Sequence, residues 1–174
     1  MEILIGIILS AVAIALLFVI IMGIFFTIDV FFELPYVGAQ KNCIDTIIKF
    51  ASIKKGETVV DLGSGDGRLL FAAAEADAKA VGYEINPFLI ALTLIRTKLK
   101  GLSNNVWVER QSLWKADLKV ADVIFVYAKR KTMPKFEKFI FQNTAKGTRV
   151  VVNTNPFPNK KPQRQENGIF LYKV

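Results

Sequence analysis

A glycine-rich turn between an expected strand and an expected helix constrains the fold of this chain more than any other stretch. Residues 58–62 are mostly apolar and include Asp61. Glycines follow at positions 63, 65 and 67, and a helical pattern begins at Arg68. Glycine accepts positive φ and lets a ligand approach the backbone, so amides of such a turn can face an anionic group. The spacing differs from the patterns of dinucleotide sites and of phosphate-loop NTPases, which excludes both by motif.

A second acidic residue makes this turn part of a predicted binding site. Residues 80–84 are expected to form the next strand, which ends on Glu84, 23 positions beyond Asp61. A carboxylate at the tip of a neighbouring parallel strand can accept hydrogen bonds from both hydroxyls of a ribose. The two features together predict a cofactor that contains adenosine, in preference to a tight strand-to-helix connection without a ligand.

The remaining pattern predicts a doubly wound, mostly parallel α/β sheet with a C-terminal antiparallel hairpin. Its ligand crevice is expected at the carboxyl ends of the strands. Apolar periodicity at 44, 47, 48 and 51 indicates a helix before the first strand. The expected strands are 58–62, 80–84, 106–109, 123–127 and 148–152, the expected helices are 68–76, 87–100 and 135–143, and Asn167-Gly168 joins hairpin strands 161–165 and 169–174.

The amino-terminal segment has a different composition from the rest of the chain. Residues 3–28 carry no charge and include only Ser10 and Thr27 as polar side chains. As a helix they would extend about 39 Å, enough to cross a bilayer core of about 30 Å with some tilt. A secretory signal is the rival interpretation, but Met1-Glu2 lacks the basic residues of such signals. We therefore expect a transmembrane anchor and exit over 1–34 and a separate domain over 35–174.

The distribution of basic residues predicts the orientation of the anchor. All 23 Lys and Arg residues follow the apolar run, which places the domain on the cytoplasmic side, or on the matrix side in a mitochondrion. Cys43 is the only cysteine, which is compatible with a reducing compartment. The chain has no histidine, which excludes a His general base and a His-ligated metal, so no metal site is expected.

The runs 61–68 and 82–88 resemble motif I and the following acidic motif of seven-strand, class I S-adenosylmethionine-dependent methyltransferases, a Rossmann-like fold. Three further stretches are similar to the ATP-synthase c-subunit lysine methyltransferase family and its prokaryotic relatives. They are Pro35-Tyr36-Val37, Ser112-Leu113-Trp114-Lys115 and Pro156-Phe157-Pro158. The resemblance covers about residues 35 to 174.

The resemblance implies S-adenosylmethionine as the cofactor and assigns roles to its site. Amides near Gly63 and Gly65 would hold the amino-acid end of the cofactor, Asp61 would receive its ammonium, and Glu84 would bind the ribose. Ile85 and Asn86 would flank the adenine, and Tyr36 belongs to a stretch that resembles a cofactor-covering loop or is an ordinary linker. The implied cofactor-binding residues are Tyr36, Asp61, Gly63, Ser64, Gly65, Gly67, Glu84, Ile85, Asn86, Ser112 and Leu113.

Two positions bear on activity. Relatives commonly have an acid where this chain has Ser112, whose hydroxyl accepts a hydrogen bond without charge assistance.

The fourth strand ends in Tyr127 and lacks the Asn/Asp-Pro-Pro-aromatic motif of enzymes that methylate adenine or glutamine amides. Tyr127 is a candidate to contact the cofactor or orient the nucleophile, or it packs on the sheet as a strand-end aromatic. Pro156, Phe157 and Pro158 are expected to wall a lysine channel.

Charge is unevenly divided along the chain. Residues 129–174 carry 11 basic and 2 acidic side chains, whereas residues 1–128 carry 12 and 13. An anionic lipid surface is the expected partner of the basic segment, a solvated face is the alternative, and nucleic acid is not expected.

These features predict a membrane-anchored methyltransferase that modifies a lysine of a membrane-associated protein. The alternatives are a methyltransferase of a lipid or membrane-soluble small molecule, an S-adenosylmethionine-binding sensor or pseudoenzyme, and, more distantly, a dehydrogenase.

Overall fold

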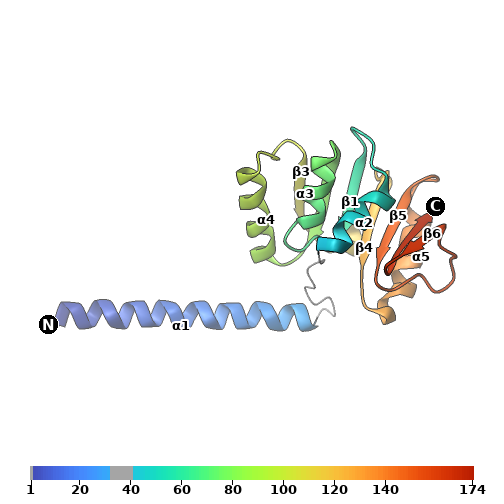
Figure 1. The fold of residues 1–174 in the computed structure, drawn as a ribbon. Helices are drawn as coiled ribbons and strands as arrows, with labels where there is room; N and C mark the ends of the chain where they lie inside the picture. The colour runs from blue at the N-terminus through green and yellow to red at the C-terminus, as the bar shows by residue number, and fades with distance from the viewer. Residues whose placement is uncertain (1, 32–40) are drawn as a thin grey trace. The chain divides into compact units, whose positions relative to one another are not determined.

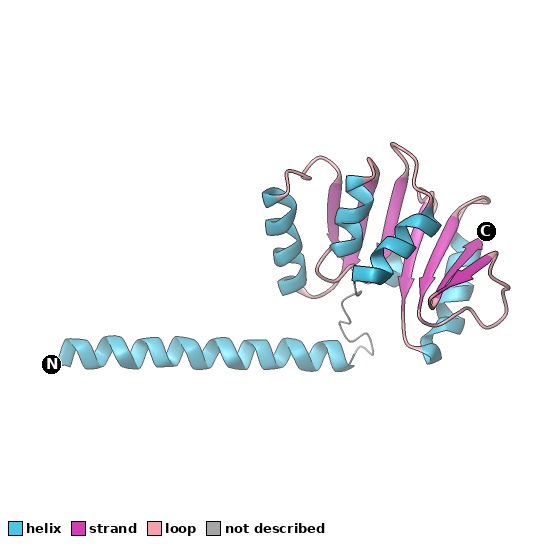
Figure 2. Ribbon diagram, in the orientation of Figure 1, coloured by secondary structure: helices cyan, strands magenta, loops and turns pink. Residues whose placement is uncertain are grey.

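The computed structural model of the protein describes residues 2–31 and 41–174, which fall into two compact units, Met1–Tyr36 and Val37–Val174. Figures 1 and 2 show the ribbon coloured along the chain and by secondary structure. The helices are α1 Glu2–Phe31, α2 Lys41–Ala51, α3 Arg68–Glu75, α4 Pro87–Leu99 and α5 Met133–Asn143, with short 3-10 turns η1 Leu113–Lys115 and η2 Arg130–Thr132. The strands are β1 Thr58–Leu62, β2 Lys79–Glu84, β3 Val106–Arg110, β4 Val123–Tyr127, β5 Arg149–Asn153, β6 Arg164–Glu166 and β7 Ile169–Lys173.

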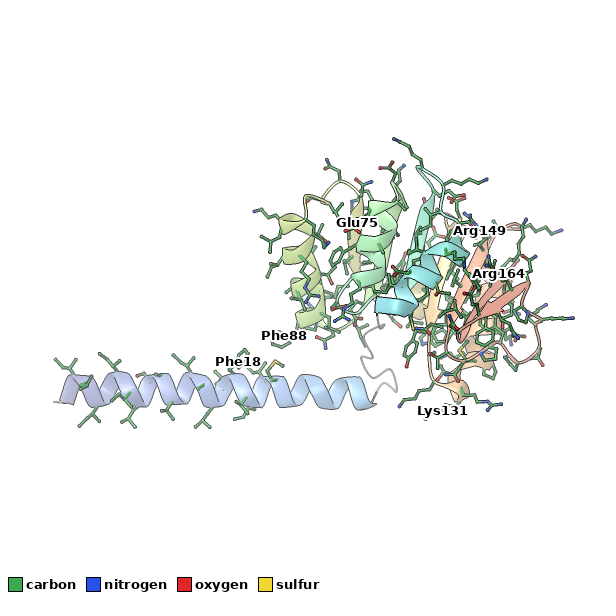
Figure 3. The ribbon with its side chains drawn as sticks, in the orientation of Figure 1. Phe18, Glu75, Phe88, Lys131, Arg149 and Arg164 are labelled. Carbon is green, nitrogen blue, oxygen red and sulfur yellow. The ribbon has the colours of Figure 1, made fainter. Side chains whose placement is uncertain are left out.

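The first unit contains a single long helix, α1. Its segment Ile3–Gly23 is long and apolar enough to cross a membrane, judged by length and composition, although a signal sequence near an N-terminus has the same properties. The side chains of this segment project outward from the helix and are exposed (Figure 3).

The second unit is built on one seven-stranded sheet with the order β3-β2-β1-β4-β5-β7-β6. The pairs from β3 to β5 are parallel, and β7 pairs antiparallel with both β5 and β6. The chain leaves β1 toward β2 and later returns to β4 on the other side of β1. This reversal places the topological switch point between β1 and β4, at the carboxyl ends of the strands.

Helices cover both faces of the sheet, which buries the apolar strands β1, β4 and β5 on two sides. Right-handed crossovers place α3 and α4 on one face and α5 on the other. Helix α2 lies on the same face as α3 and packs on β5 and β7. The core between this layer and the sheet includes Phe50, Leu70, Phe125 and Val151.

The predicted fold class is confirmed, and the predicted strands agree with the observed ones to within a residue or two, except in the hairpin. Its first strand begins at Arg164, three residues later than expected. Pro162 has no N–H to donate to a ladder. The Asn159 N–H donates to the Glu137 carboxylate (2.9 Å), so the preceding chain is held against α5 as a loop.

Candidate functional site

The glycine-rich turn lies where β1 ends, beside the switch point of the sheet. Gly63, Gly65 and Gly67 have φ of 88°, 56° and 81°, so all three adopt the conformation that favours glycine. A side chain on Gly67 would lie 2.6 Å from Thr93 Cγ2, whereas one on Gly63 would meet only Leu113, at 3.8 Å. The turn is therefore closed toward α4 and open above Gly63.

The amides of this turn are engaged within the protein. Gly63 and Ser64 both donate to the Tyr83 carbonyl, at 3.0 and 3.2 Å. The Gly65 N–H donates to Glu84 Oε2 at 3.0 Å. The expectation that amides near Gly63 and Gly65 hold the amino-acid end of a cofactor therefore stays a prediction, and in this conformation those two amides bind β2 instead.

Glu84 organises the tip of β2. Its Oε1 accepts hydrogen bonds from the N–H groups of Ile85 and Asn86, both at 2.8 Å, and its Oε2 accepts the one from Gly65. Three N–H donors hold the carboxylate in one orientation, and its remaining lone pairs can receive hydroxyl groups. The side chain of Asn86 accepts from the Phe88 N–H at 3.0 Å and caps α4. The two residues expected to flank the adenine thus help to orient Glu84 through their backbone.

Asp61 is the most perturbed acidic group of the crevice. Its side chain is buried and accepts no hydrogen bond from the described residues. Burial raises the pKa of this carboxyl group to about 7, and the negative charges of Glu84 and Asp66 add to the effect. A cation bound beside Asp61 would counter both causes, so the site favours a ligand with a positive charge.

The contacts that anchor the turn to α4 were not predicted from the sequence. Asp66 receives Arg96 Nη1 at 2.7 Å and Arg68 Nε at 2.9 Å, and the Thr93 hydroxyl donates to the Gly65 carbonyl at 3.2 Å. Thr93 and Arg96 lie about 30 positions from their partners, and no local pattern indicates such pairs. These contacts fix the loop that carries the open backbone at Gly63.

Gly82 allows the turn to approach β2 closely. A side chain there would lie 2.5 Å from Ser64 Oγ and 2.7 Å from Leu70 Cδ1. Ser64 Oγ is itself buried without a hydrogen-bond partner among the described residues. The glycine of the second motif is therefore required by packing, and Ser64 faces β2.

The loop after β3 forms the opposite wall. The Gln111 N–H donates to the Glu84 carbonyl at 3.2 Å, which brings Ser112 and Leu113 to the crevice. Ser112 precedes η1 and its side chain makes no cap hydrogen bond, while Leu113 is buried. Tyr36, the expected covering residue, lies outside the described residues.

The third side of the crevice is formed by the ends of β4 and β5. Tyr127 is half-buried and stands in register with Asn153. The neighbouring Thr154 has φ of 74°, a strained conformation for a β-branched residue. Its hydroxyl donates to Asn153 Oδ1 at 3.0 Å, and Asn155 donates to the Ala128 carbonyl at 2.8 Å. No residue pattern in this segment indicates the strain.

The three residues of the predicted lysine channel separate in the structure. Phe157 is buried, with its ring 4.7 Å from that of Tyr172 and 5.9 Å from that of Phe141. Pro156 and Pro158 are exposed on either side of it. Phe157 thus belongs to the packing between α5 and β7, and the expectation that Pro156, Phe157 and Pro158 wall a lysine channel stays a prediction.

A hollow lies at the opposite, amino-terminal ends of the strands. It is lined by Lys54, Lys119 and Lys146, among others, and includes no residue of the glycine-rich turn. The acidic groups and the open backbone lie at the carboxyl ends, so we place the functional site there.

Comparison with known proteins identifies the family of this chain. The family described as the ANTKMT methyltransferase domain matches residues 61–164, from Asp61 of the turn to the start of the hairpin. The lysine N-methyltransferase of the ATP synthase c-subunit from Rattus norvegicus is 33% identical over 129 residues, which cover 74% of this chain and 59% of that protein. The adenine nucleotide translocase lysine N-methyltransferase of Mus musculus is 32% identical over 131 residues, which cover 75% of this chain and 57% of that protein. The chain thus spans about three-fifths of the length of these curated relatives.

One solved structure extends the comparison over nearly a whole chain. An RNA methyltransferase from Salinibacter ruber, crystallised with S-adenosyl-L-homocysteine, superposes with a TM-score of 0.75 at 27% identity. The match covers 79% of this chain and 94% of that one. The two proteins therefore share the methyltransferase fold over most of this chain.

Proposed function

Since this chain belongs to the ANTKMT methyltransferase family, we propose that it transfers a methyl group from S-adenosylmethionine to a lysine side chain of a membrane-associated protein. The relatives that methylate lysine support the reaction class, and the residues of the crevice support the cofactor. The proposal rests above all on one observation. The buried Asp61 carboxylate has no hydrogen-bond donor among the described residues and lies beside open backbone at Gly63.

The crevice residues fit this cofactor. Asp61 would receive the ammonium of the amino-acid end, Glu84 the ribose hydroxyls, and Ile85, Asn86 and Leu113 would provide apolar surface and edges for the adenine. The cofactor supplies an electrophilic methyl group on a positively charged sulfur. The two buried acids would favour the binding of such a cationic ligand.

The loops expected to face the acceptor are basic, opposite in charge to Asp61 and Glu84. Lys129 and Arg130 follow β4, Lys160 and Lys161 follow β5, and all four are exposed. A lysine acceptor must lose its proton before it attacks, which costs about 4.6 kcal/mol at pH 7 for an ordinary lysine with a pKa of about 10.4. Nearby cations and the sulfonium of the cofactor lower that pKa, because they disfavour the charged amine. The remaining role of Tyr127, half-buried at the end of β4, would be to contact the cofactor or orient the amine.

The membrane supplies the location of the substrate in this proposal. Helix α1 would anchor the chain, with the domain on the cytoplasmic side or on the matrix side of a mitochondrion. A tether limits the domain to a thin layer beside the bilayer, which raises the effective concentration of lysines at that depth. A reporter fused after Val174 should behave as cytoplasmic in a bacterial host, and export of the reporter would refute the orientation.

Binding and transfer can be tested separately. The purified full chain should bind S-adenosylmethionine and S-adenosyl-L-homocysteine in calorimetry, and Glu84→Gln should weaken both. An amide in place of Glu84 presents an NH₂ group to one of the three N–H donors that now point at the carboxylate. Glu109→Gln, on the neighbouring edge strand and exposed, is the matched control and should bind normally.

Radiolabelled methyl transfer into membranes from a deletion strain identifies the acceptor class. Label in a protein band, followed by mass spectrometry of a methylated lysine, is the expected result. Label in the organic extract would assign a lipid or small-molecule acceptor, and tight cofactor binding without any transfer would assign a sensor.

RNA is the second candidate acceptor. The RNA methyltransferase from Salinibacter ruber matches over nearly its whole length, and the segment 129–174 carries 11 basic and 2 acidic side chains. If label from the same assay appears in the RNA fraction and is lost after ribonuclease treatment, the lysine proposal is wrong and the cofactor proposal stands.

A further inference from the structure

Helix α4 has an unusual distribution of buried and exposed side chains. The buried residues are Thr93 and Thr97, whereas Leu92, Ile95 and Leu99 are 37%, 58% and 81% exposed. Thr97 Oγ1 is buried without a hydrogen-bond partner among the described residues. On a helix that covers a sheet, the larger apolar residues normally face inward, and here they face outward.

Three of the exposed apolar residues form one continuous stripe, and the exposed Leu94 lies outside it. Leu92, Ile95 and Leu99 are three and four positions apart, so they lie along one side of the helix, opposite Thr93 and Thr97. We call these three residues the outer stripe. Removing apolar surface from water is favourable, and the exposed parts of Ile95 and Leu99 do not gain from it while they face water. The stripe therefore fits an apolar environment outside the domain.

The charges around the outer stripe indicate which environment this is. The helix contains no acidic residue, and Arg96 and Lys98 flank the stripe on its two sides. Arg96 also pairs with Asp66, but its side chain stays 39% exposed. Lys100 follows the helix and pairs with Glu75 of α3, which is labelled in Figure 3. Long basic side chains on both flanks of an apolar stripe are typical of helices that lie in the headgroup region of a bilayer.

A second copy of the chain is a less favourable occupant. Two α4 helices that met through their outer stripes would bring the Lys98 side chains of both copies, and both partly exposed Arg96 side chains, around one interface. These like charges would repel one another across the interface, and α4 has no acidic residue to neutralise them. Anionic headgroups provide the complementary charge instead.

We propose that the outer stripe of α4 binds the surface of an anionic bilayer and holds the domain flat against it. Because α4 connects the parallel strands β2 and β3, it runs back along the sheet from the carboxyl ends to the amino ends (Figure 1). With α4 on the surface, the strands run parallel to the membrane plane. The crevice then opens sideways, at the level of the headgroups. This last consequence rests on the proposed function, since it gives a lysine at that depth direct access to the site.

Fluorescence quenching on the full chain in liposomes tests the proposal. In a Cys43→Ser background, Ile95→Cys provides a single labelling site on the outer stripe, and Val120→Cys is the matched control. Val120 is 57% exposed and lies in the loop before β4. A bimane label at position 95 should lose about half of its emission to doxyl lipids in phosphatidylcholine–phosphatidylglycerol liposomes and be shielded from iodide, because interfacial helices insert about 5–10 Å. The label at position 120 should show the reverse pattern.

A charge-reversing substitution strengthens the test. Leu99→Glu should reduce lipid quenching at position 95 and restore quenching by iodide, whereas Val120→Glu should leave both unchanged. Iodide quenching at position 95 equal to that at position 120 would overturn the proposal. Shielding from both quenchers would also overturn it, and would assign a second copy if dilution of protein in the liposomes abolishes the shielding, or α1 if it does not. Neither measurement depends on methyl transfer, so failure here leaves the proposed function intact.

Discussion

Asp61 lowers the stability of the unliganded protein, although the same carboxylate would favour the binding of a cationic ligand. Its carboxyl group is buried beside two other acids, and its pKa is raised from 3.8 to about 7. An acid with a raised pKa in the folded state holds its proton longer than in the unfolded state. The free energy of unfolding therefore falls as the pH rises from about 4 to about 7, and the full penalty is present above pH 7.

Asp61→Asn should stabilise the unliganded protein above pH 7. Asparagine resembles the protonated carboxyl group in shape and cannot ionise, so it removes a penalty of up to about 4 kcal/mol, the equivalent of the shift to about 7. Thermal unfolding followed by tryptophan fluorescence at pH 8 and at pH 4 measures the effect, which should disappear at pH 4. Equal destabilisation at both values would show that the carboxylate is satisfied in the folded state.

The same group should make cofactor binding depend on pH. A cationic ligand favours the ionised form of Asp61, so binding releases a proton below pH 7 and the affinity for S-adenosylmethionine should fall about fivefold from pH 7 to pH 6. Calorimetry in two buffers of different ionisation enthalpy measures both the affinity and the proton release. In Asp61→Asn the affinity should be lower at both values and independent of pH, and a retained pH dependence would assign it to another group.

The elements around the crevice are joined by close contacts between backbone and small side chains. The turn after β1 lies so close to β2 that Gly82 has no room for a side chain, and it contacts α4 through Thr93 and Arg96. Well-packed regions of this kind do not absorb an added methyl group without a shift of the backbone. The geometry of the site is thus a property of three elements held together.

Gly82→Ala should displace the turn and weaken cofactor binding. The added methyl group would lie 2.5 Å from Ser64 Oγ, and we expect a loss of about 1–3 kcal/mol in the free energy of unfolding. Val81→Ala, the adjacent residue on the other face of the strand, is the control and should keep its affinity for S-adenosylmethionine. If Gly82→Ala binds the cofactor as tightly as Val81→Ala does, the turn is more adaptable than these contacts indicate.

Across the whole chain, the two units have separate requirements. The core cluster of the second unit begins at α2 and contains no described residue of α1. That cluster is built mainly from residues of α2, α3 and the sheet, so the second unit has a hydrophobic core of its own. The stability of the domain should therefore be independent of the first helix.

Residues 37–174 expressed without α1 should fold cooperatively and keep their affinity for S-adenosylmethionine. Calorimetric melting and titration of this fragment and of the full chain in detergent provide the comparison, with melting temperatures expected to agree. Methyl transfer into membranes should fall more than cofactor affinity does, because the tether is lost. A fragment that fails to melt cooperatively would show that α1 or its connection to α2 completes the domain.

Local signals in the chain are enough to predict the order of the elements, the position of the turn and the location of Asp61 and Glu84 on neighbouring strands. These signals are apolar strands, glycines that need positive φ, and Pro87 at a helix start. Each of these signals acts over a few residues, so it indicates the same local structure whatever the overall fold. For the same reason the hairpin is predicted correctly, while the start of its first strand is not, since a contact between Asn159 and α5 decides it.

Contacts between distant residues, which no local signal encodes, establish which groups meet and what surrounds them. The pairing of Asp66 with Arg96, the close approach at Gly82 and the burial of Phe157 between α5 and β7 are all of this kind. The outward stripe of α4 appears only when the burial of Thr93 and Thr97 is known. The pKa of Asp61 depends on burial and on two other carboxylates, because desolvation and charge are properties of an environment that the folded chain creates.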